Sequence, residues 1–261
     1  MSYLRIFIFA LIYCVPISFF AQNSDTLEYK YESYLLRAVY DSSKFCSDLI
    51  ISKDKSVVYK EECLDYRISS IFADDLEGSG KKYVFIETYS GGAHCCTYLL
   101  SAELKDDKFS YIDSIWWGNS GYNIKDINND GRKEILGYND MFAYAFTNFA
   151  QSAFSIAIYT FKNGKFHFAN KEFADEVIAH IKELKTDLKD YIKTGFDCPR
   201  GENDDTFNTD AGAVKAILAP IVADYQSIGR TDEGYDYVKK IYKCPDRDKF
   251  IKILKTDYKL K

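Results

Sequence analysis

The sequence predicts an α+β protein, with an N-terminal antiparallel β-repeat domain of propeller-blade-like units followed by an α-helical C-terminal region. Two observations predict the β part: polar turns between apolar runs recur three times, and a loop rich in Asp and Gly recurs twice at nearly the same period. In the last third, apolar residues recur at helical spacing. We therefore expect a signal peptide at 1–21, a β-repeat domain at 22–170 and a helical region at 171–261.

The first 21 residues have the composition of a secretory signal peptide. They carry one positive charge, Arg5, no acidic residue, and an apolar run that ends at Ala21. The run is short for a transmembrane span, and an uncleaved N-terminal anchor is the alternative. Cys14 does not indicate a lipoprotein, because Tyr13 stands where a lipobox needs a small residue. We expect an exported protein, periplasmic or extracellular, with no stable membrane span after cleavage.

Charge and composition narrow the class of partner. The net charge of −5 argues against a general role in binding nucleic acid. The Lys-rich tail at 239–261 could touch an anionic surface, but Lys spaced along an amphipathic helix is typical of its solvated face. The 22 Tyr and 19 Phe residues suit sheets built on aromatic cross-strand pairs.

Three hairpins are predicted in the β part, at KDKSVVY (53–59), KDDKFSYI (105–112) and KNGKFHFA (162–169). Their starts are 52 and then 57 residues apart. The loops DLEGSGKKYVFIE and DINNDGRKEILGY, at 75–87 and 126–138, are offset by 51 residues. We interpret residues 30–170 as about three β units of the length typical of propeller blades. Three units do not close a propeller by themselves, so they stack openly or are capped by the rest of the chain.

The C-terminal region is predicted to contain four helices. The first, within 171–193, places one apolar stripe on its surface. A second begins at Thr209 or Asp210 as N-cap, and Pro220 is expected to kink or end it. Two shorter helices are expected near 232–243 and 245–258, the last with Pro245 in its first turn. The stripe of the first helix comprises Ala174, Val177, Ile178, Ile181, Leu184, Leu188 and Ile192.

The loop DINNDGRKE has the ligand spacing of a calcium loop. It offers side-chain oxygens at alternating positions, a Gly that permits a tight bend, one carbonyl and a closing carboxylate. EF-hand loops begin in the same way, but Gly137 stands where their final Glu is needed and the flanks resemble strands. A turn without an ion is the alternative, because Asp, Asn and Gly form turns unaided. The expected Ca²⁺ ligands are Asp126, Asn128, Asp130, Arg132 through its carbonyl, and Glu134.

The earlier copy of this loop is expected to bind an ion weakly at most. Asp75, Glu77 and Ser79 keep oxygens at the alternating positions. Tyr83, however, occupies the place of the closing carboxylate. This loop is therefore expected to keep its bend and to lose most of its affinity for a cation.

The second loop and the strand after it resemble the FG-GAP or VCBS repeats of integrin-type propellers and of secreted bacterial proteins. Residues 72–260 are also similar to exported bacterial proteins of unassigned function that share a GGAHCC segment, a DLDGDG-type loop, an AYAF segment and a helical C-terminus. The resemblance implies calcium binding within a β-repeat domain. It implies no reaction, because such domains serve adhesion, glycan binding and scaffolding alike.

The segment YSGGAHCC (89–96) is interpreted as a glycine corner between strands. An exported chain favours disulfides, and the candidates beyond the signal peptide are Cys46, Cys63, Cys95, Cys96, Cys198 and Cys244. We expect Cys95 or Cys96 to pair with Cys46 or Cys63, and the last two cysteines to join the helices. A vicinal disulfide, a metal or redox site using His94 and Cys96, and a catalytic thiol are the alternatives.

The sequence as a whole predicts a non-enzymatic, calcium-binding module that contacts an unidentified protein or glycan at the cell envelope. The alternative is an envelope hydrolase or a thiol- or metal-dependent oxidoreductase centred on GGAHCC. No pair of carboxylates stands out as a glycosidase site, and Ser90 lacks the strand–elbow–helix setting of a serine hydrolase. The aromatic segment 143–154 fits either a sugar-binding face or core.

Overall fold

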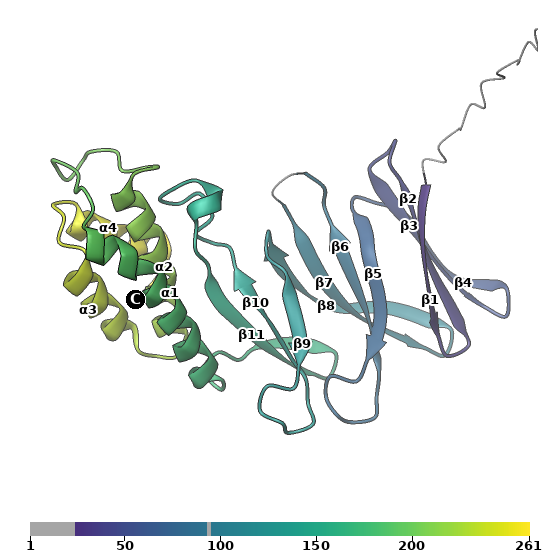
Figure 1. The fold of residues 1–261 in the computed structure, drawn as a ribbon. Coiled ribbons are helices and arrows are strands. Elements are labelled where there is room, and N and C mark those ends of the chain that lie inside the picture. The colour runs from purple at the N-terminus through teal and green to yellow at the C-terminus, as the bar shows by residue number, and fades with distance from the viewer. Residues whose placement is uncertain (1–23, 93–94) are drawn as a thin grey trace, which may run out of the picture.

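The computed structural model describes residues 24–92 and 95–261. The predicted signal peptide and His94 lie outside the described residues. Three four-stranded antiparallel sheets come first and four α-helices follow (Figure 1). The strands are β1 Ser24–Tyr31, β2 Tyr34–Asp41, β3 Cys46–Lys53, β4 Ser56–Leu64, β5 Arg67–Asp74, β6 Tyr83–Tyr89, β7 Thr97–Lys105, β8 Lys108–Gly118, β9 Tyr122–Lys125, β10 Glu134–Asn139, β11 Ser155–Lys162 and β12 Lys165–Phe168.

Each sheet is a meander of strands consecutive in the chain, in the orders β1-β2-β3-β4, β5-β6-β7-β8 and β12-β11-β10-β9. The three sheets stand side by side in chain order, and the helices lie beyond the third (Figure 1). Within the described residues the strands form three separate sheets that stand in a row and do not close into a barrel or a ring of blades (Figure 1). The predicted mixture of antiparallel sheets and C-terminal helices is confirmed at this level.

The three predicted hairpins occupy the same position in their sheets, between the third and fourth strands. Both central residues of each turn have positive φ: 49° and 69° at Asp54–Lys55, 52° and 60° at Asp106–Asp107, and 53° and 80° at Asn163–Gly164. Two consecutive residues with positive φ are the mark of a type I′ turn, whose twist matches that of the flanking strands. Asp, Asn and Gly tolerate this conformation best, which explains why the polar turns were visible in the sequence.

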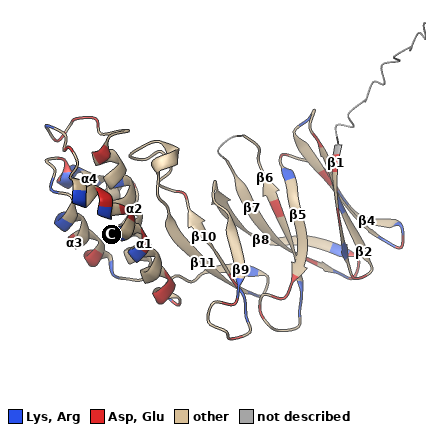
Figure 2. Cartoon of the chain, viewed as in Figure 1, with Lys and Arg blue, Asp and Glu red and all other residues tan. Residues whose placement is uncertain are grey.

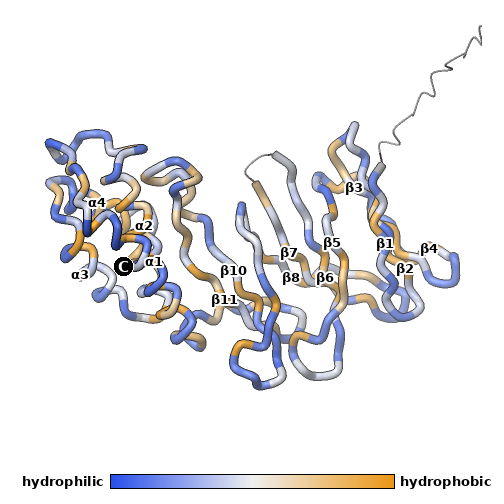
Figure 3. The backbone as a smooth tube through the Cα atoms, viewed as in Figure 1, coloured by the Kyte–Doolittle hydropathy of each residue, from blue (hydrophilic) through white to orange (hydrophobic). Residues whose placement is uncertain are grey.

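Three apolar layers hold the stack together, and hydrophobic stretches run along the strands of all three sheets (Figure 3). The first layer joins the first and second sheets and includes Leu36, Leu49 and Ile86. A second layer, around Phe85 and Trp117, joins the second and third sheets. The third sheet packs on its other side against the helices. Each sheet therefore buries a face against its neighbour, which a single hairpin cannot do alone.

The helices are α1 Ala174–Thr194, α2 Asp210–Ser227, α3 Thr231–Ile241 and α4 Arg247–Thr256. Thr209 caps α2 as predicted, since its side chain accepts a hydrogen bond from the N–H of Gly212. The prediction for Ile192 was wrong, because its side chain is 47% exposed while Leu188 on the same helix is fully buried. Charged residues cluster on the outer helices and in the turns (Figure 2). None of the described helices is both long enough and apolar enough to span a membrane.

The structure corrects part of what was expected of the two prolines. Helix α2 continues seven residues beyond Pro220, to Ser227, so Pro220 does not end the helix, while the expected kink stays a prediction. Every residue from Ala211 to Tyr225 is buried, so packing on all sides compensates for the missing N–H. Pro245 lies two residues before α4 rather than in its first turn.

Candidate functional site

The two Asp- and Gly-rich loops join the first and second strands of their sheets and lie against each other. The second loop runs from β9 to β10 and the first from β5 to β6. The N–H of Lys133 donates to the carbonyl of Leu76 at 2.9 Å, and its ammonium pairs with Asp74 at 2.8 Å. Gly78, with φ +66°, allows this contact because a Cβ there would lie 2.7 Å from the Gly131 carbonyl oxygen. In the first sheet the equivalent connection, between β1 and β2, is only two residues long.

The second loop is wound around the side chains at its alternating positions. Asp126 accepts hydrogen bonds from the N–H groups of Asp130 at 3.1 Å and Gly131 at 2.9 Å. Asn128 accepts from Asp130, and Asp130 accepts from Arg132 at 2.9 Å. This last bond holds the pKa of Asp130 below its ordinary value. The predicted side-chain donors at 126, 128 and 130 are therefore gathered in one turn.

Glu134 closes the loop from the first position of β10. Its side chain is almost fully buried, and one carboxylate oxygen accepts a hydrogen bond from the N–H of Ile127 at 2.9 Å. Burial raises the pKa of Glu134, and the nearby charges of Asp130 and Asp126 raise it further against the opposing effect of that hydrogen bond. Three carboxylates thus repel one another at one end of the loop, and a bound cation would offset that repulsion.

The donor set suits a hard cation, but the side chains of the loop do not form a ready-made cage. Among the described residues, no group of three or more His, Cys, Asp or Glu side chains is placed to hold a metal. The loop has three carboxylates, one amide and one carbonyl, and the side-chain oxygens named above accept backbone hydrogen bonds. A carboxylate has about four lone-pair sites, so these bonds leave acceptor capacity for an ion.

The first loop keeps its bend without gathering its three candidate donors. Asp75 accepts from the N–H groups of Ser79 at 3.1 Å and Gly80 at 2.5 Å. Glu77 instead accepts from the N–H of Asn163 in the β11–β12 turn of the neighbouring sheet. This carboxylate therefore ties the second sheet to the third.

A cleft of about 700 Å³ opens beside the second loop. Its lining mixes donors of the loop with cationic and aromatic side chains from β11, β12 and the segment before α1. An ion in the loop would therefore lie at the wall of a space large enough for a small ligand. The lining includes Glu77, Asn128, Asp130, Arg132, Glu134, Lys162, His167 and Phe173.

All six cysteines of the described residues are paired, as Cys46–Cys63, Cys95–Cys96 and Cys198–Cys244. The expectation that Cys95 or Cys96 pairs with the first two was wrong. Cys46 and Cys63 lie on neighbouring antiparallel strands with their Cα atoms 4.8 Å apart, within the range that a disulfide spans. The expected link between Cys198 and Cys244 is present and joins the α1–α2 loop to the segment before α4.

The segment around the vicinal pair is the glycine corner that the sequence predicts. Gly91 and Gly92 have φ of 86° and 98°, a conformation that glycine adopts without strain. The N–H of Ser90 donates to the carbonyl of Cys96 at 3.0 Å, and the N–H of Cys96 donates to the Ser90 hydroxyl at 2.7 Å. In this structure the corner presents a disulfide rather than two free thiols.

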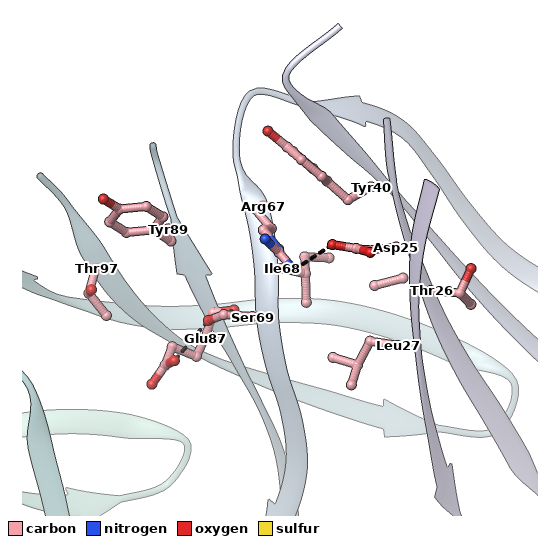
Figure 4. Close-up of a pocket in the computed structure, with 11 residues that line it drawn as sticks. Asp25, Thr26, Leu27, Tyr40, Arg67, Ile68, Ser69, Glu87, Tyr89 and Thr97 are labelled. Carbon is pink, nitrogen blue, oxygen red and sulfur yellow. Dashed lines mark hydrogen bonds and ion pairs between the residues drawn. The ribbon is translucent and has the colours of Figure 1, made fainter. Parts of the chain in front are cut away.

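A second pocket, of about 530 Å³, straddles β5 where the first two sheets meet (Figure 4). Arg67 pairs with Asp25 at 2.7 Å and lies 5.4 Å from the ring centre of Tyr40. On the other side of β5, the Ser69 hydroxyl donates to Glu87 at 2.8 Å. The pocket therefore presents aromatic rings, hydroxyls and charges of both signs, and sequence patterns did not indicate it because its residues come from five strands.

Two buried pairs of ionisable side chains in the helical region were also not predicted from the sequence. His180 contacts Asp224 at 2.7 Å, and burial raises the pKa of Asp224 to about 6 even though His180 and the N–H of Ile156 lower it. Lys215 pairs with Asp246 at 2.8 Å. The sequence did indicate that these two residues are buried and paired, because Lys215 and Asp224 are the charged residues inside the otherwise apolar helix α2.

The chain was compared with known proteins. No family model matches it, and no solved structure matches it. It is 27% identical over 170 residues to a probable thylakoid lumen protein of Synechocystis sp.. The match covers 61% of this chain and 43% of that protein, so the chain spans less than half of the length of this relative.

Proposed function

We propose that the protein is an exported, calcium-stabilised β-repeat module of the FG-GAP or VCBS type that binds a partner at the cell envelope. The observation that carries the proposal is the loop between β9 and β10. It gathers the oxygens of Asp126, Asn128 and Asp130, and the buried Glu134 closes it, with a pKa raised by burial and further by the two neighbouring carboxylates. A hard cation with about six to eight oxygen ligands suits this donor set, with the Arg132 carbonyl and water completing the shell.

Export is supported by the cysteines and by the relative. Three disulfides in the described residues point to an oxidising compartment, since the cytosol keeps thiols reduced. The relative described as a probable thylakoid lumen protein supports a compartment reached by export. The predicted signal peptide at 1–21 agrees with both the disulfides and the relative. The module acts in the periplasm or outside the cell.

The binding role is supported by the two clefts of the β part. The pocket across β5 offers the faces of Tyr40 and Tyr89 together with polar groups of Asp25, Arg67 and Glu87. Such a mixture of aromatic faces and hydrogen-bonding groups suits a glycan or a polar peptide. The cleft beside the second loop would couple ligand binding to the cation. The partner is thus a protein or glycan of the envelope.

Thermal unfolding with and without calcium tests the cation claim. We expect the melting temperature to rise when calcium replaces EDTA, because an ion that binds only the folded state stabilises it by about 2.7 kcal/mol at a hundred times its Kd. Asp126→Asn should abolish most of this rise. Asp75→Asn is the matched control, since it makes the same change in the first loop and should leave the calcium response intact. An unchanged melting temperature in EDTA contradicts the proposal.

Thiol titration of the denatured protein separates this proposal from the alternative of a thiol- or metal-dependent enzyme at GGAHCC. A disulfide-linked corner predicts no titratable thiol among the six cysteines beyond the signal peptide. Two free thiols at Cys95 and Cys96, with stoichiometric zinc or copper in elemental analysis, would favour the enzyme.

A further inference from the structure

A cavity in the helical region has a charged floor that neither the fold nor the proposed function requires. The cavity measures about 450 Å³ and is walled by the β10–β11 loop, the α1–α2 loop, α4 and the segment after α4. Lys215 of α2 lines it and is nine-tenths buried, in a helix whose other residues from Ala211 to Tyr225 are also buried. A lysine is rarely buried unless it is paired, and the partner of Lys215 is Asp246.

The floor of the cavity is a hydrogen-bonded group centred on this lysine. Its ammonium donates to the Thr206 hydroxyl at 2.5 Å and to Asp246 at 2.8 Å. The second oxygen of Asp246 accepts from the hydroxyl of Tyr242 at 2.9 Å. An ammonium has three donors, and the described residues supply acceptors for two of them. The third is left for an acceptor that enters the cavity.

The walls above the floor are aromatic. Phe146, Phe250 and Tyr258 line the cavity, and the ring of Phe146 lies 5.1 Å from that of Phe250 and 6.1 Å from that of Tyr258. Such rings hold an aliphatic stem by contact and attract a cation to their faces. The walls therefore suit a ligand with an apolar middle and a positive end.

The rim of the cavity is acidic. Four carboxylates line it, all on exposed residues, against the single partly exposed ammonium of Lys249, which donates to Asn203 at 3.1 Å. The floor contributes no net charge, because Lys215 and Asp246 neutralise each other. An organic cation is thus favoured at the mouth of the cavity. The four rim carboxylates are Glu202, Asp204, Asp205 and Asp257.

The cavity is held open by covalent and steric constraints rather than by a mobile lid. The Cys198–Cys244 disulfide anchors the loop that carries the rim. Gly212 allows two walls to approach the first turn of α2, since a Cβ there would lie 2.1 Å from the carbonyl oxygen of Thr206 and 2.6 Å from that of Phe146. A preformed site of this kind loses little entropy on binding.

We propose that this cavity binds a basic amino acid, free or as the C-terminal residue of a short peptide. The α-carboxylate accepts the third hydrogen bond of Lys215, the aliphatic stem lies against the aromatic wall formed by Phe146, Phe250 and Tyr258, and the cationic end meets the rim carboxylates. The cavity volume is within the range typical of small-molecule sites.

Isothermal titration calorimetry of the full protein with L-arginine tests the proposal. Two analogues examine the two ends of the ligand separately: agmatine lacks the carboxylate, and L-citrulline lacks the charge. We expect both to bind at least about tenfold more weakly than arginine, because each leaves one recognition element unused. Equal affinity for arginine and agmatine, or for arginine and citrulline, overturns the assignment.

Variants at the rim test the site without disturbing its buried floor. Glu202→Gln combined with Asp257→Asn should weaken arginine binding about tenfold or more. Asp232→Asn combined with Asp236→Asn removes the same charge from exposed positions on α3 and should leave binding unchanged. An equal loss of arginine affinity in both pairs of variants would mean a non-specific charge effect and overturns the proposal. The absence of any binding heat at millimolar arginine overturns it as well.

Discussion

Glu134 shows how one residue links the strand pattern to the electrostatics of the loop before it. It is the first residue of β10, where it pairs with Lys125 of β9, and its side chain is buried rather than solvated. Its carboxylate therefore occupies the end of the loop together with Asp126 and Asp130, which help to raise its pKa. In the first loop Tyr83 takes the equivalent place and packs into the apolar layer.

Glu134→Gln should make the protein more stable than the wild type in EDTA and less stable than the wild type in calcium. A carboxyl whose pKa is raised in the folded state binds more protons there, so stability falls as the pH rises above the ordinary value of 4.5. In EDTA the wild type should lose stability relative to Glu134→Gln as the pH rises above about 4.5. In calcium at pH 7 the wild type should be the more stable protein.

Denaturant unfolding across this pH range checks the expectation, with Glu172→Gln as the control. Glu172 lines the same cleft but lies outside the loop. If the free energy of unfolding of both variants changes with pH as that of the wild type does, in EDTA and in calcium, Glu134 has no special role in the loop.

Packing, rather than backbone conformation, explains why position 137 is a glycine. A Cβ at this position would lie 2.6 Å from the Trp117 ring and 2.7 Å from the carbonyl oxygen of Gly121. Gly137→Ala should therefore lower the free energy of unfolding by about 1–3 kcal/mol. Gly121→Ala is the matched control, because its Cβ would meet nothing within 4 Å. Chemical denaturation of both variants measures the difference, and equal stability would mean that the tryptophan moves aside freely.

At the scale of the element, α1 buries one face only and packs it chiefly against α2. The apolar stripe read from the sequence continues one turn too far, since Leu188 is fully buried and Ile192 is 47% exposed. Leu188→Ala should cost about 2–5 kcal/mol in the free energy of unfolding. Ile192→Ala should change it by less than about 0.5 kcal/mol. Thermal or urea unfolding distinguishes the two, and similar losses would place the end of the helix against the core.

Local chemistry explains which elements could be predicted from the sequence. The three hairpin turns were visible because positive φ at both central residues favours Asp, Asn or Gly in a short stretch. The continuation of α2 through Pro220 was not visible, because only the packing around the helix tolerates the missing hydrogen bond. The pairing of Cys46 with Cys63 was equally out of reach, since it depends on β3 and β4 lying side by side.

At the scale of the whole molecule, three sheets and a helical region form one continuous stack. The chain composition and the period of the turns predicted the order of these parts. The partners of Lys215 could not be predicted, because Thr206, Lys215 and Asp246 come from three segments that meet only in the packed structure. The candidate ligands of the second loop were predictable, as they lie within nine consecutive residues.

The stack also predicts how the loops contribute to its stability. The two Asp- and Gly-rich loops touch through Lys133 and Leu76, so a cation in the second loop would brace the second sheet against the third. Limited proteolysis should therefore cut the segment 125–134 faster in EDTA than in calcium. Cleavage at equal rates in both conditions would mean that no ion orders this loop.

Calorimetric titration of calcium into the protein tests the central claim most directly. The loop between β9 and β10 predicts one calcium ion bound per chain, with binding lost in Asp126→Asn and retained in Asp75→Asn. Absence of binding heat at millimolar calcium, or equal binding by the wild type and Asp126→Asn, would contradict the claim.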